Sequence, residues 1–213
     1  MSDSANDLPK IYLARHGETA WTKTRQHTGR TDIPLTPDGE DDARLIGRRL
    51  AHLKFTRVFT SPLQRARRTC ELAGFPTADL DPDLMEWDYG AFEGLKSAEI
   101  KARSPDWDLF RDGAPSGETP DDIAARADRV VERLRGLTGN VLVFAHGHYL
   151  RVLAARWCRV AVPFGRHLLL GTSSISVLWF EHGKLDEPAI MLWNDDRHLS
   201  GEGCLLPLPS PTH

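Results

Sequence analysis

The stretch Leu13-Ala14-Arg15-His16-Gly17-Glu18-Thr19 follows a short apolar run, Lys10 to Ala14, and places an arginine, a histidine and a glycine where that run ends. The run has the length and composition of a strand, so the three residues fall on the turn that leaves it. A second pair, His146-Gly147, follows the apolar run Val141 to Ala145 in the same way. Two imidazoles and a guanidinium at the ends of two strands can form a phosphate-transfer centre.

Strands and helices alternate through much of the chain. Strands are predicted over residues 11–14, 57–60, 141–145, 174–180 and 189–193. A helix is predicted to start at Thr36-Pro37, with an apolar stripe that reaches Leu53. Other helices are predicted from a capping box at Ser61 to about Ala73, from Thr119-Pro120 to near Gly136, and from about Tyr149 to Cys158. This order favours the α/β class, as a three-layer α/β/α fold with a mostly parallel central sheet.

Polar residues follow three of these strands and should meet at one edge of the sheet. His16, Ser61 and His146 each come directly after a predicted strand. In open α/β sheets, ligands bind beyond the carboxyl ends of the strands. We therefore expect one site to contain all three side chains.

Length and composition limit the classes of protein to consider. The chain of 213 residues suits a single domain, which we expect over 10–198, with a disordered lead-in over 1–9 and an extended tail over 199–213. A net charge of −3 argues against a nucleic-acid partner. The three cysteines form no CxxC pair, and no apolar run is long enough for a membrane span, so we expect a cytoplasmic protein with reduced thiols.

Four elements together carry a family resemblance over roughly residues 10 to 195. They are Arg15-His16-Gly17, the segment SPLQRA at 61–66, the segment LMEWDYGAFEG at 84–94, and His146-Gly147-His148 with Arg151 behind it. With LTPDG at 35–39, they resemble in order and spacing the histidine phosphatase superfamily, which is also called phosphoglycerate mutase-like. The resemblance implies the phosphoglycerate mutase-like fold and phosphoryl transfer through a phosphohistidine.

The resemblance also implies roles for five catalytic residues. His16 would attack phosphorus as a neutral imidazole and split one difficult step into two. Arg15 and Arg65 would grip the phosphate with planar forks, and His146 would stabilise the transferring oxygens. Glu86 would give a proton to the leaving alkoxide, whereas its other interpretation is a structural pairing with an arginine. Glu93 competes for the role of donor, but we expect it to be structural.

A second set of residues is expected to bind the substrate. Gly17 and Gly147 would let backbone N–H groups approach the phosphate closely. The family pattern adds Thr22, Thr28 and Gly29, although many members have asparagine and glutamine where the two threonines stand. His148 and Arg151 follow the second histidine–glycine turn, where they would contact the organic part of a substrate or a second anion, or pack on the surface. Trp21, His27 and Arg30 are further candidates for the substrate mouth, with packing favoured for Trp21.

The core residues leave the choice between phosphatase and mutase open. Phosphoglycerate mutases resemble one another in having an arginine directly after the donor glutamate, whereas this chain has Trp87 at that position. They also have a basic insertion between the glutamate and the second histidine, whereas residues 96–118 of this chain carry mixed charges. The chain looks more like the branch of sugar-phosphate phosphatases that includes sedoheptulose-bisphosphatase-like proteins and mycobacterial acid phosphatases. A bisphosphate would need a second cationic subsite, with Arg30, His148 and Arg151 as candidates. Mutase-type transfer is the alternative, and a non-catalytic binding protein is a further one.

We expect neither a metal nor a cofactor. The sequence contains no HExxH motif and no dense run of Asp, Glu and His. Small phosphate esters are the expected partners, and an oligomer remains possible.

Overall fold

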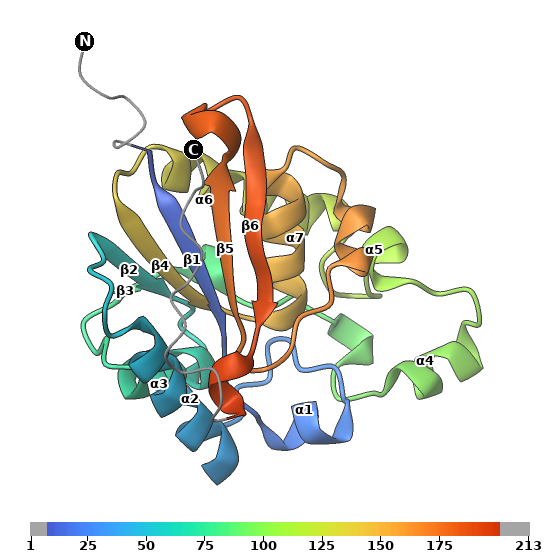
Figure 1. Cartoon of the computed structure of the whole chain (residues 1–213). Helices are drawn as coiled ribbons and strands as arrows, with labels where there is room; N and C mark the ends of the chain where they lie inside the picture. Colours follow the sequence, from blue (N-terminus) through green and yellow to red (C-terminus); the bar gives the residue numbers. More distant parts are fainter. Residues whose placement is uncertain (1–7, 201–213) are drawn as a thin grey trace.

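A six-stranded sheet brings segments from both halves of the chain together. The computed structural model describes residues 8–200, and its strands lie in the order β3-β2-β4-β1-β5-β6 (Figure 1). The strands are β1 Lys10–Arg15, β2 Arg57–Thr60, β3 Asp79–Leu80, β4 Asn140–Ala145, β5 Ile175–Phe180 and β6 Pro188–Asp195. The first four are parallel, and β5 pairs antiparallel with both β1 and β6. The predicted mostly parallel sheet is confirmed.

Helices cover both faces of the sheet, which gives three layers. The helices are α1 Ala20–Thr24, α2 Pro37–Leu50, α3 Gln64–Leu72, α4 Ser97–Arg103, α5 Leu109–Asp112, α6 Pro120–Arg135 and α7 Gly147–Trp157. In β1, Ile11 and Leu13 belong to the core beneath α6 and α7, whereas Tyr12 and Ala14 belong to the core beneath α2 and α3. This alternation follows from the two-residue repeat of a strand, and it buries both faces of β1.

Capping residues set where the two long helices begin. The Thr36 hydroxyl accepts the N–H of Gly39, and the Thr119 hydroxyl accepts the N–H of Asp122, each with a proline in the first turn behind it. Both predicted starts are confirmed. The apolar stripe of the first of these helices reaches Leu53, but α2 itself ends at Leu50.

Two other predicted helix starts are wrong. Helix α3 begins at Gln64 and has no side-chain cap from Ser61, because the Ser61 hydroxyl lies against His146 instead. Asp32 accepts the N–H of Gln64 in its place, at 2.7 Å. Helix α7 begins at Gly147, two residues before the predicted start, so His146 stands directly at its N-terminus.

The chain between β3 and α6, residues 81–118, forms an arm beside the carboxyl edge of the sheet. It contains the short 3-10 helices Pro82–Leu84 and Gly90–Phe92 and the helices α4 and α5. Figure 1 shows α4 extending away from the sheet, with α1 lying next to the same edge. The arm and α1 therefore enclose the space beyond the strand ends.

Both ends of the described chain are placed against the domain. Leu8 packs against the core and Pro9 is buried, so ordered structure begins before the predicted boundary at residue 10. A last 3-10 helix, Arg197–Leu199, extends one residue beyond the predicted domain end. The rest of the predicted lead-in and tail lies outside the described residues. None of the described helices combines the length and apolar character needed to cross a bilayer.

Candidate active site

Three polar residues stand at the carboxyl ends of neighbouring strands. The N–H of His16 donates to Ala145 at 3.0 Å, and the N–H of Ser61 donates to Phe144 at 3.0 Å, so β1 and β2 deliver both residues to the end of β4. The rings of His16 and His146 lie 5.2 Å apart between centroids. The strands thus place His16, Ser61 and His146 at one edge, as the strand pattern indicates.

His16 is held as a neutral imidazole, and its second ring nitrogen has no hydrogen-bond partner among residues 8–200. Its Nδ1 lies 2.7 Å from the carbonyl oxygen of Gly17, which only accepts hydrogen bonds, so Nδ1 carries the proton and Nε2 keeps a lone pair. Burial lowers the pKa of His16 well below its usual range, and the charges of Arg65 and Arg15 lower it further. A neutral ring with an unprotonated Nε2 is a nucleophile at neutral pH.

Arg15 lies flat against Gly147. A Cβ atom on Gly147 would lie 3.0 Å from the Arg15 Cζ, so a side chain here would require the guanidinium to shift. One terminal nitrogen of Arg15 donates to the carbonyl of Leu170, whereas its Nε is buried with no partner among the described residues. Burial lowers the pKa of Arg15, and Glu86 opposes that shift.

Three backbone carbonyls fix Arg65. Its terminal nitrogens donate to Thr31 at 3.0 Å, Thr28 at 3.1 Å and Gly29 at 2.8 Å, and the side chain is fully buried. Its Nε has no partner within residues 8–200. The charge therefore sits next to the two histidines without a carboxylate bonded to it.

His146 is positioned by Ser61. Its Nε2 lies 2.8 Å from the Ser61 hydroxyl, which also accepts the N–H of Leu63 at 3.3 Å. Its Nδ1 is buried and has no partner in the described part of the chain. Burial lowers the pKa of His146 well below its usual range, as do the charges of Arg65, His16 and Arg15.

Glu86 is bound by backbone amides. Its Oε1 accepts the N–H groups of Trp87 at 2.9 Å and Tyr149 at 2.8 Å, and its Oε2 accepts that of His148 at 3.1 Å. Two of these donors belong to the first turn of α7, where unpaired N–H groups favour an anion. Within residues 8–200 no arginine is bonded to the carboxylate, so the alternative of a structural arginine pair is not what the structure has.

These side chains surround a cavity of about 290 Å³ between α1, the arm and the strand ends. The cavity is lined by eight of the predicted site residues: Arg15, His16, Thr22, Thr28, Glu86, Gly147, His148 and Arg151. Four other predicted site residues are not part of the lining: Gly17, Gly29, Arg65 and His146. Arg30 is not in the lining, because it lies 3.8 Å from Asp88 and 3.6 Å from Glu118 in ion pairs.

Two expected phosphate contacts have other partners. The N–H of Gly17 donates to the Thr69 hydroxyl at 3.0 Å, and the glycine itself packs on the backbone of Gly39, so its amide does not face the cavity. The Thr22 hydroxyl donates to the carbonyl of Thr19 and accepts the Thr19 N–H, which uses it as a helix cap. The expectation that Gly17 offers its amide to the phosphate is therefore wrong.

Hydrogen bonds of Thr28, Gly29 and Glu93 fix the structure next to the cavity. Carbonyls of Thr28 and Gly29 hold Arg65, as described above, and the carboxylate of Glu93 accepts the N–H groups of Gly29 at 2.8 Å and Thr31 at 3.2 Å. Glu93 is absent from the cavity lining. It fixes the loop whose carbonyls bind Arg65, which agrees with the structural role expected for it.

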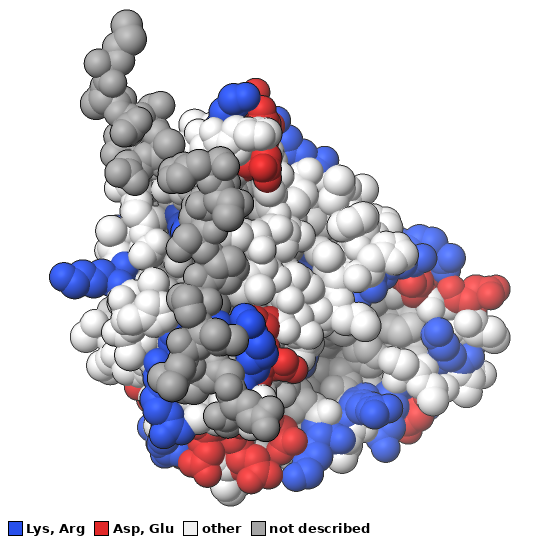
Figure 2. Space-filling view, viewed as in Figure 1, with Lys and Arg blue, Asp and Glu red and all other residues white. Residues whose placement is uncertain are grey.

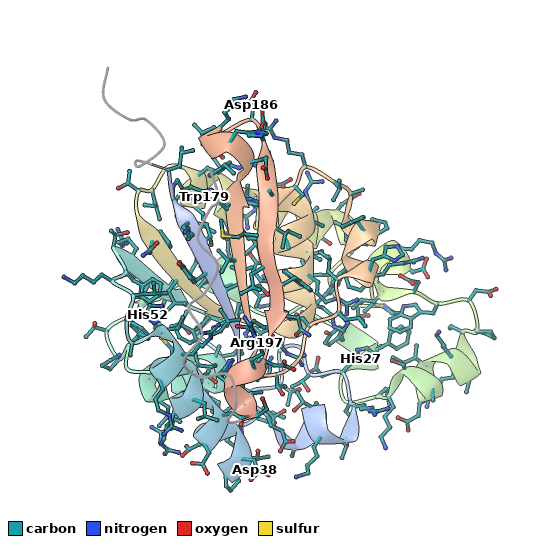
Figure 3. All side chains as sticks on the ribbon, in the orientation of Figure 1. His27, Asp38, His52, Trp179, Asp186 and Arg197 are labelled. Carbon is teal, nitrogen blue, oxygen red and sulfur yellow. The ribbon has the colours of Figure 1, made fainter. Side chains whose placement is uncertain are left out.

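An aromatic wall closes the side of the cavity next to the arm. The rings of His27 and His148 stack 5.9 Å apart, and the Tyr89 hydroxyl is hydrogen-bonded to His148 Nδ1. Burial lowers the pKa of His27 to about 4 and that of His148 well below its usual range. Figure 3 shows His27 between the strand ends and α4. Trp21 is outside the lining and packs its ring on Gly94, as favoured from the sequence.

Three contributors to the site were not predicted. Thr69 lies on α3 four residues after Arg65 and binds the amide of Gly17, but a threonine on a helix carries no signal for that role. The Leu170 carbonyl that holds Arg15 has no side-chain signature at all. Arg25, in the cavity lining, follows a helix too short to be recognised from periodicity. Within residues 8–200, no three His, Cys, Asp or Glu side chains gather as a metal site would require.

Comparisons with known proteins agree with this geometry. Residues 11–196 match the family described as the histidine phosphatase superfamily, branch 1. An acid phosphatase of Mycobacterium tuberculosis is 37% identical over 178 residues, which cover 82% of this chain and 88% of the relative. A sedoheptulose 1,7-bisphosphatase of Saccharomyces cerevisiae is 34% identical, covering 86% of this chain and 92% of the relative. A solved structure from Mycobacterium tuberculosis superimposes with a TM-score of 0.82 at 35% identity, covering 87% of this chain and 96% of its own.

Proposed function

Because the chain belongs to the histidine phosphatase superfamily, we propose that it hydrolyses phosphomonoesters of small metabolites, sugar phosphates in particular, through a phosphohistidine at His16. Two of the similar proteins described above are named phosphatases, and one of them is named for a sugar bisphosphate.

The state of His16 carries this proposal. Its Nε2 has a lone pair, its pKa is lowered by burial and two arginines, and it borders the cavity. Three buried nitrogens without partners among the described residues belong to its neighbours: Arg15 Nε, Arg65 Nε and His146 Nδ1. Buried donors normally have acceptors, and the oxygens of a phosphoryl group would satisfy these.

The first step forms the phosphohistidine. The Nε2 lone pair of His16 attacks phosphorus, and the bond between phosphorus and the ester oxygen breaks. Glu86 gives a proton to the departing oxygen, which leaves as an alcohol. Oε2 suits this task better than Oε1, because it accepts one backbone N–H rather than two. The positive groups around His16 stabilise the charge that the phosphoryl oxygens carry in the transition state.

The second step regenerates the enzyme. Water enters from the cavity side and attacks the phosphorus of the phosphohistidine. Glu86, now a carboxylate, takes a proton from that water, and the bond between phosphorus and Nε2 breaks. Inorganic phosphate leaves, and His16 returns to the neutral form that its hydrogen bond to Gly17 favours.

Residues after Glu86 favour phosphatase over mutase. Trp87 is fully buried and donates its ring N–H to the Glu118 carbonyl at 2.9 Å, so this position offers no cation to a substrate. Within residues 96–118, only Ser97 lines the cavity, as far as the described chain goes. The described part of the arm therefore offers no basic side chain to hold an organic intermediate while the phosphoryl group is returned to it. Water can then react with the phosphohistidine instead.

The far side of the cavity suits the organic part of the substrate. Arg151 donates Nε to Gly165 and a terminal nitrogen to Arg166, each at 2.9 Å, and lies over the ring of Phe110. It reaches the cavity beside His148, which a lowered pKa keeps uncharged. We propose that this pair contacts the substrate beyond the transferred phosphoryl group. If Arg151→Ala affects monophosphates and bisphosphates equally, Arg151 is no subsite for a second phosphate.

Trapping of the intermediate tests the proposal. With radiolabelled p-nitrophenyl phosphate, the parent should acquire an acid-labile, base-stable label at position 16, and His16→Ala should lose both label and activity. The control is His52→Ala, an exposed histidine away from the site in Figure 3, which should behave as the parent does. Labelling of His16→Ala at parental level would overturn the proposal. Formation of 2-phosphoglycerate from primed 3-phosphoglycerate, faster than hydrolysis, would favour the mutase alternative.

We also propose that the enzyme acts in the cytoplasm. Cys70 and Cys158 are both free thiols, and burial raises the pKa of Cys70 to about 12, which makes it unreactive. Unpaired cysteines are typical of reducing compartments. A small phosphate ester is the partner that the cavity would admit, and we propose no nucleic-acid partner.

A further inference from the structure

Arg25 occupies a backbone conformation that favours glycine. It ends α1 with φ 62° and ψ 35°, in the left-handed region where a side chain is strained. Within residues 8–200, six residues other than glycine have a positive φ, and Arg25 is the one among them that lines the cavity. Strain of this kind at a cavity points to a function for the side chain.

The guanidinium of Arg25 has no partner among residues 8–200. The side chain is exposed, and no carboxylate or carbonyl of the described chain is bonded to it. Other cations at the cavity differ, because Arg15 is bonded to Leu170 and Arg151 to Gly165 and Arg166. Arg25 is thus a charge that the fold leaves available to a ligand. Figure 2 shows blue side chains beside the hollow near α1 and α4.

The backbone around Arg25 is firmly fixed. The Gln26 side chain donates to the Gly94 carbonyl at 2.8 Å, the N–H of His27 donates to Leu95 at 2.9 Å, and the N–H of Gly94 donates to His27 at 2.8 Å. These bonds tie the end of α1 to the start of α4. A cation on a fixed backbone loses less freedom on binding, which favours recognition of a defined group.

We propose that Arg25 is a specificity residue that binds a second anionic group of the substrate, a phosphate or a carboxylate, beyond the phosphoryl group at His16. This inference rests on the phosphatase function proposed above. It narrows the substrates to phosphate esters that carry another anion, because the cavity lining holds one carboxylate, Glu86, against the cations Arg15, Arg25 and Arg151.

Comparison of Arg25→Gly with a matched control tests this role. Glycine suits the left-handed backbone, so the variant should fold with a Tm no lower than that of the parent. The control is Arg159→Gly, which removes the same charge at φ 60° outside the cavity. The substrates are p-nitrophenyl phosphate, fructose 6-phosphate, fructose 1,6-bisphosphate and 3-phosphoglycerate.

Arg25→Gly should lower kcat/KM about tenfold for whichever of the bisphosphate and the carboxylate ester the parent prefers, mainly through KM. For the two substrates without a second anion, the change should stay within about twofold. The preference between phosphate and carboxylate identifies the anion. High salt should shrink the effect, because the side chain is exposed.

Three results would overturn the inference. They are an equal loss on all four substrates, no loss on either doubly anionic one, and the same selective loss in Arg159→Gly. A parent that hydrolyses p-nitrophenyl phosphate but shows no preference for a second anion would also overturn it, with the phosphatase function intact. A parent inactive on every substrate would instead refute the proposed function itself.

Discussion

The proposed catalytic centre and the proposed substrate mouth are built in opposite ways. In the centre, Arg65 and His146 are fully buried, His16 is 3% exposed and Glu86 is 4% exposed, and each is held by hydrogen bonds to fixed groups at the strand ends or the start of α7. At the mouth, Arg25 directly follows α1 and Ser97 begins α4; both are exposed, and Gln26 and His27 tie the two segments together. The groups proposed to react thus depend on the sheet, whereas the proposed substrate contacts depend on short segments outside it.

Replacing Glu86, the proposed proton donor, should have the largest effect on the proposed centre and leave the mouth unchanged. Glu86→Gln should slow hydrolysis of an alkyl phosphate by about 10²–10⁴-fold, because a poor leaving group needs a proton. The loss should be much smaller for p-nitrophenyl phosphate, whose leaving group needs none. Steady-state kcat/KM for both substrates measures the difference.

Glu93→Gln is the matched control for that variant. Its carboxylate also binds backbone amides of the same neighbourhood, but it stays outside the cavity. If Glu93→Gln slowed the alkyl phosphate as selectively as Glu86→Gln does, the assignment of Glu86 as the proton donor would be wrong.

A single methyl group should disturb the centre while leaving the mouth intact. Gly147→Ala would place Cβ 3.0 Å from the Arg15 Cζ, so the guanidinium must shift by a few tenths of an ångström. Misplacement by about 1 Å in a site can cost about 10²-fold in rate, and for this smaller shift we expect kcat to fall by about three- to tenfold. Gly136→Ala, whose Cβ would meet its nearest neighbour at 3.5 Å, should keep parental kcat. A parental kcat in Gly147→Ala would show that the reaction does not depend on the position of the Arg15 guanidinium next to residue 147.

The electrostatics of the centre can be measured by titration. Arg65 lowers the pKa of His16, so Arg65→Gln should raise that pKa. Protonation removes the Nε2 lone pair, and the acidic limb of kcat/KM should therefore move to higher pH. NMR titration of the imidazole checks the shift directly. Arg67→Gln, an exposed charge on the same helix, should leave the pKa unchanged, and a fall after Arg65→Gln would contradict the assignment.

The smallest effect is expected at the mouth. Ser97→Ala removes the hydroxyl that lies 3.2 Å from His27 Nε2, at an exposed position. The kcat for p-nitrophenyl phosphate should change by no more than about twofold, as is usual for a surface substitution. A tenfold loss of kcat would mean that the mouth takes part in the chemistry, and the contrast between the regions would fail.

Sequence patterns predicted the strands with apolar runs and the helices with capping motifs. The apolar runs before His16 and His146 are β1 and β4, and the threonine–proline pairs start α2 and α6. Strand β3 was missed because Asp79 and Leu80 are both exposed and form no pattern. The helix start at Ser61 was wrong because the motif resembles a local cap, while the hydroxyl instead binds a histidine 85 residues away.

Candidate site residues could be named from the sequence where a motif contains their side chains. This applies to Arg15, His16 and His146, which follow strands, and to Glu86, which the family resemblance singles out. The partners of Arg65 could not be predicted, because it binds the backbone carbonyls of Thr28, Gly29 and Thr31, and every residue has such a carbonyl. The bond from Arg15 to the carbonyl of Leu170 could not be predicted for the same reason. Contacts between a side chain and a distant backbone need the fold before they can be recognised.

The long separations within the centre have a consequence for folding. Arg15 and Leu170 are 155 residues apart, His146 and Ser61 are 85 apart, and Tyr149 and Glu86 are 63 apart. Contacts this remote form late, after local helices. During refolding, turnover should therefore reappear only after helical circular dichroism has recovered, which makes the reaction itself a reporter of the completed chain topology.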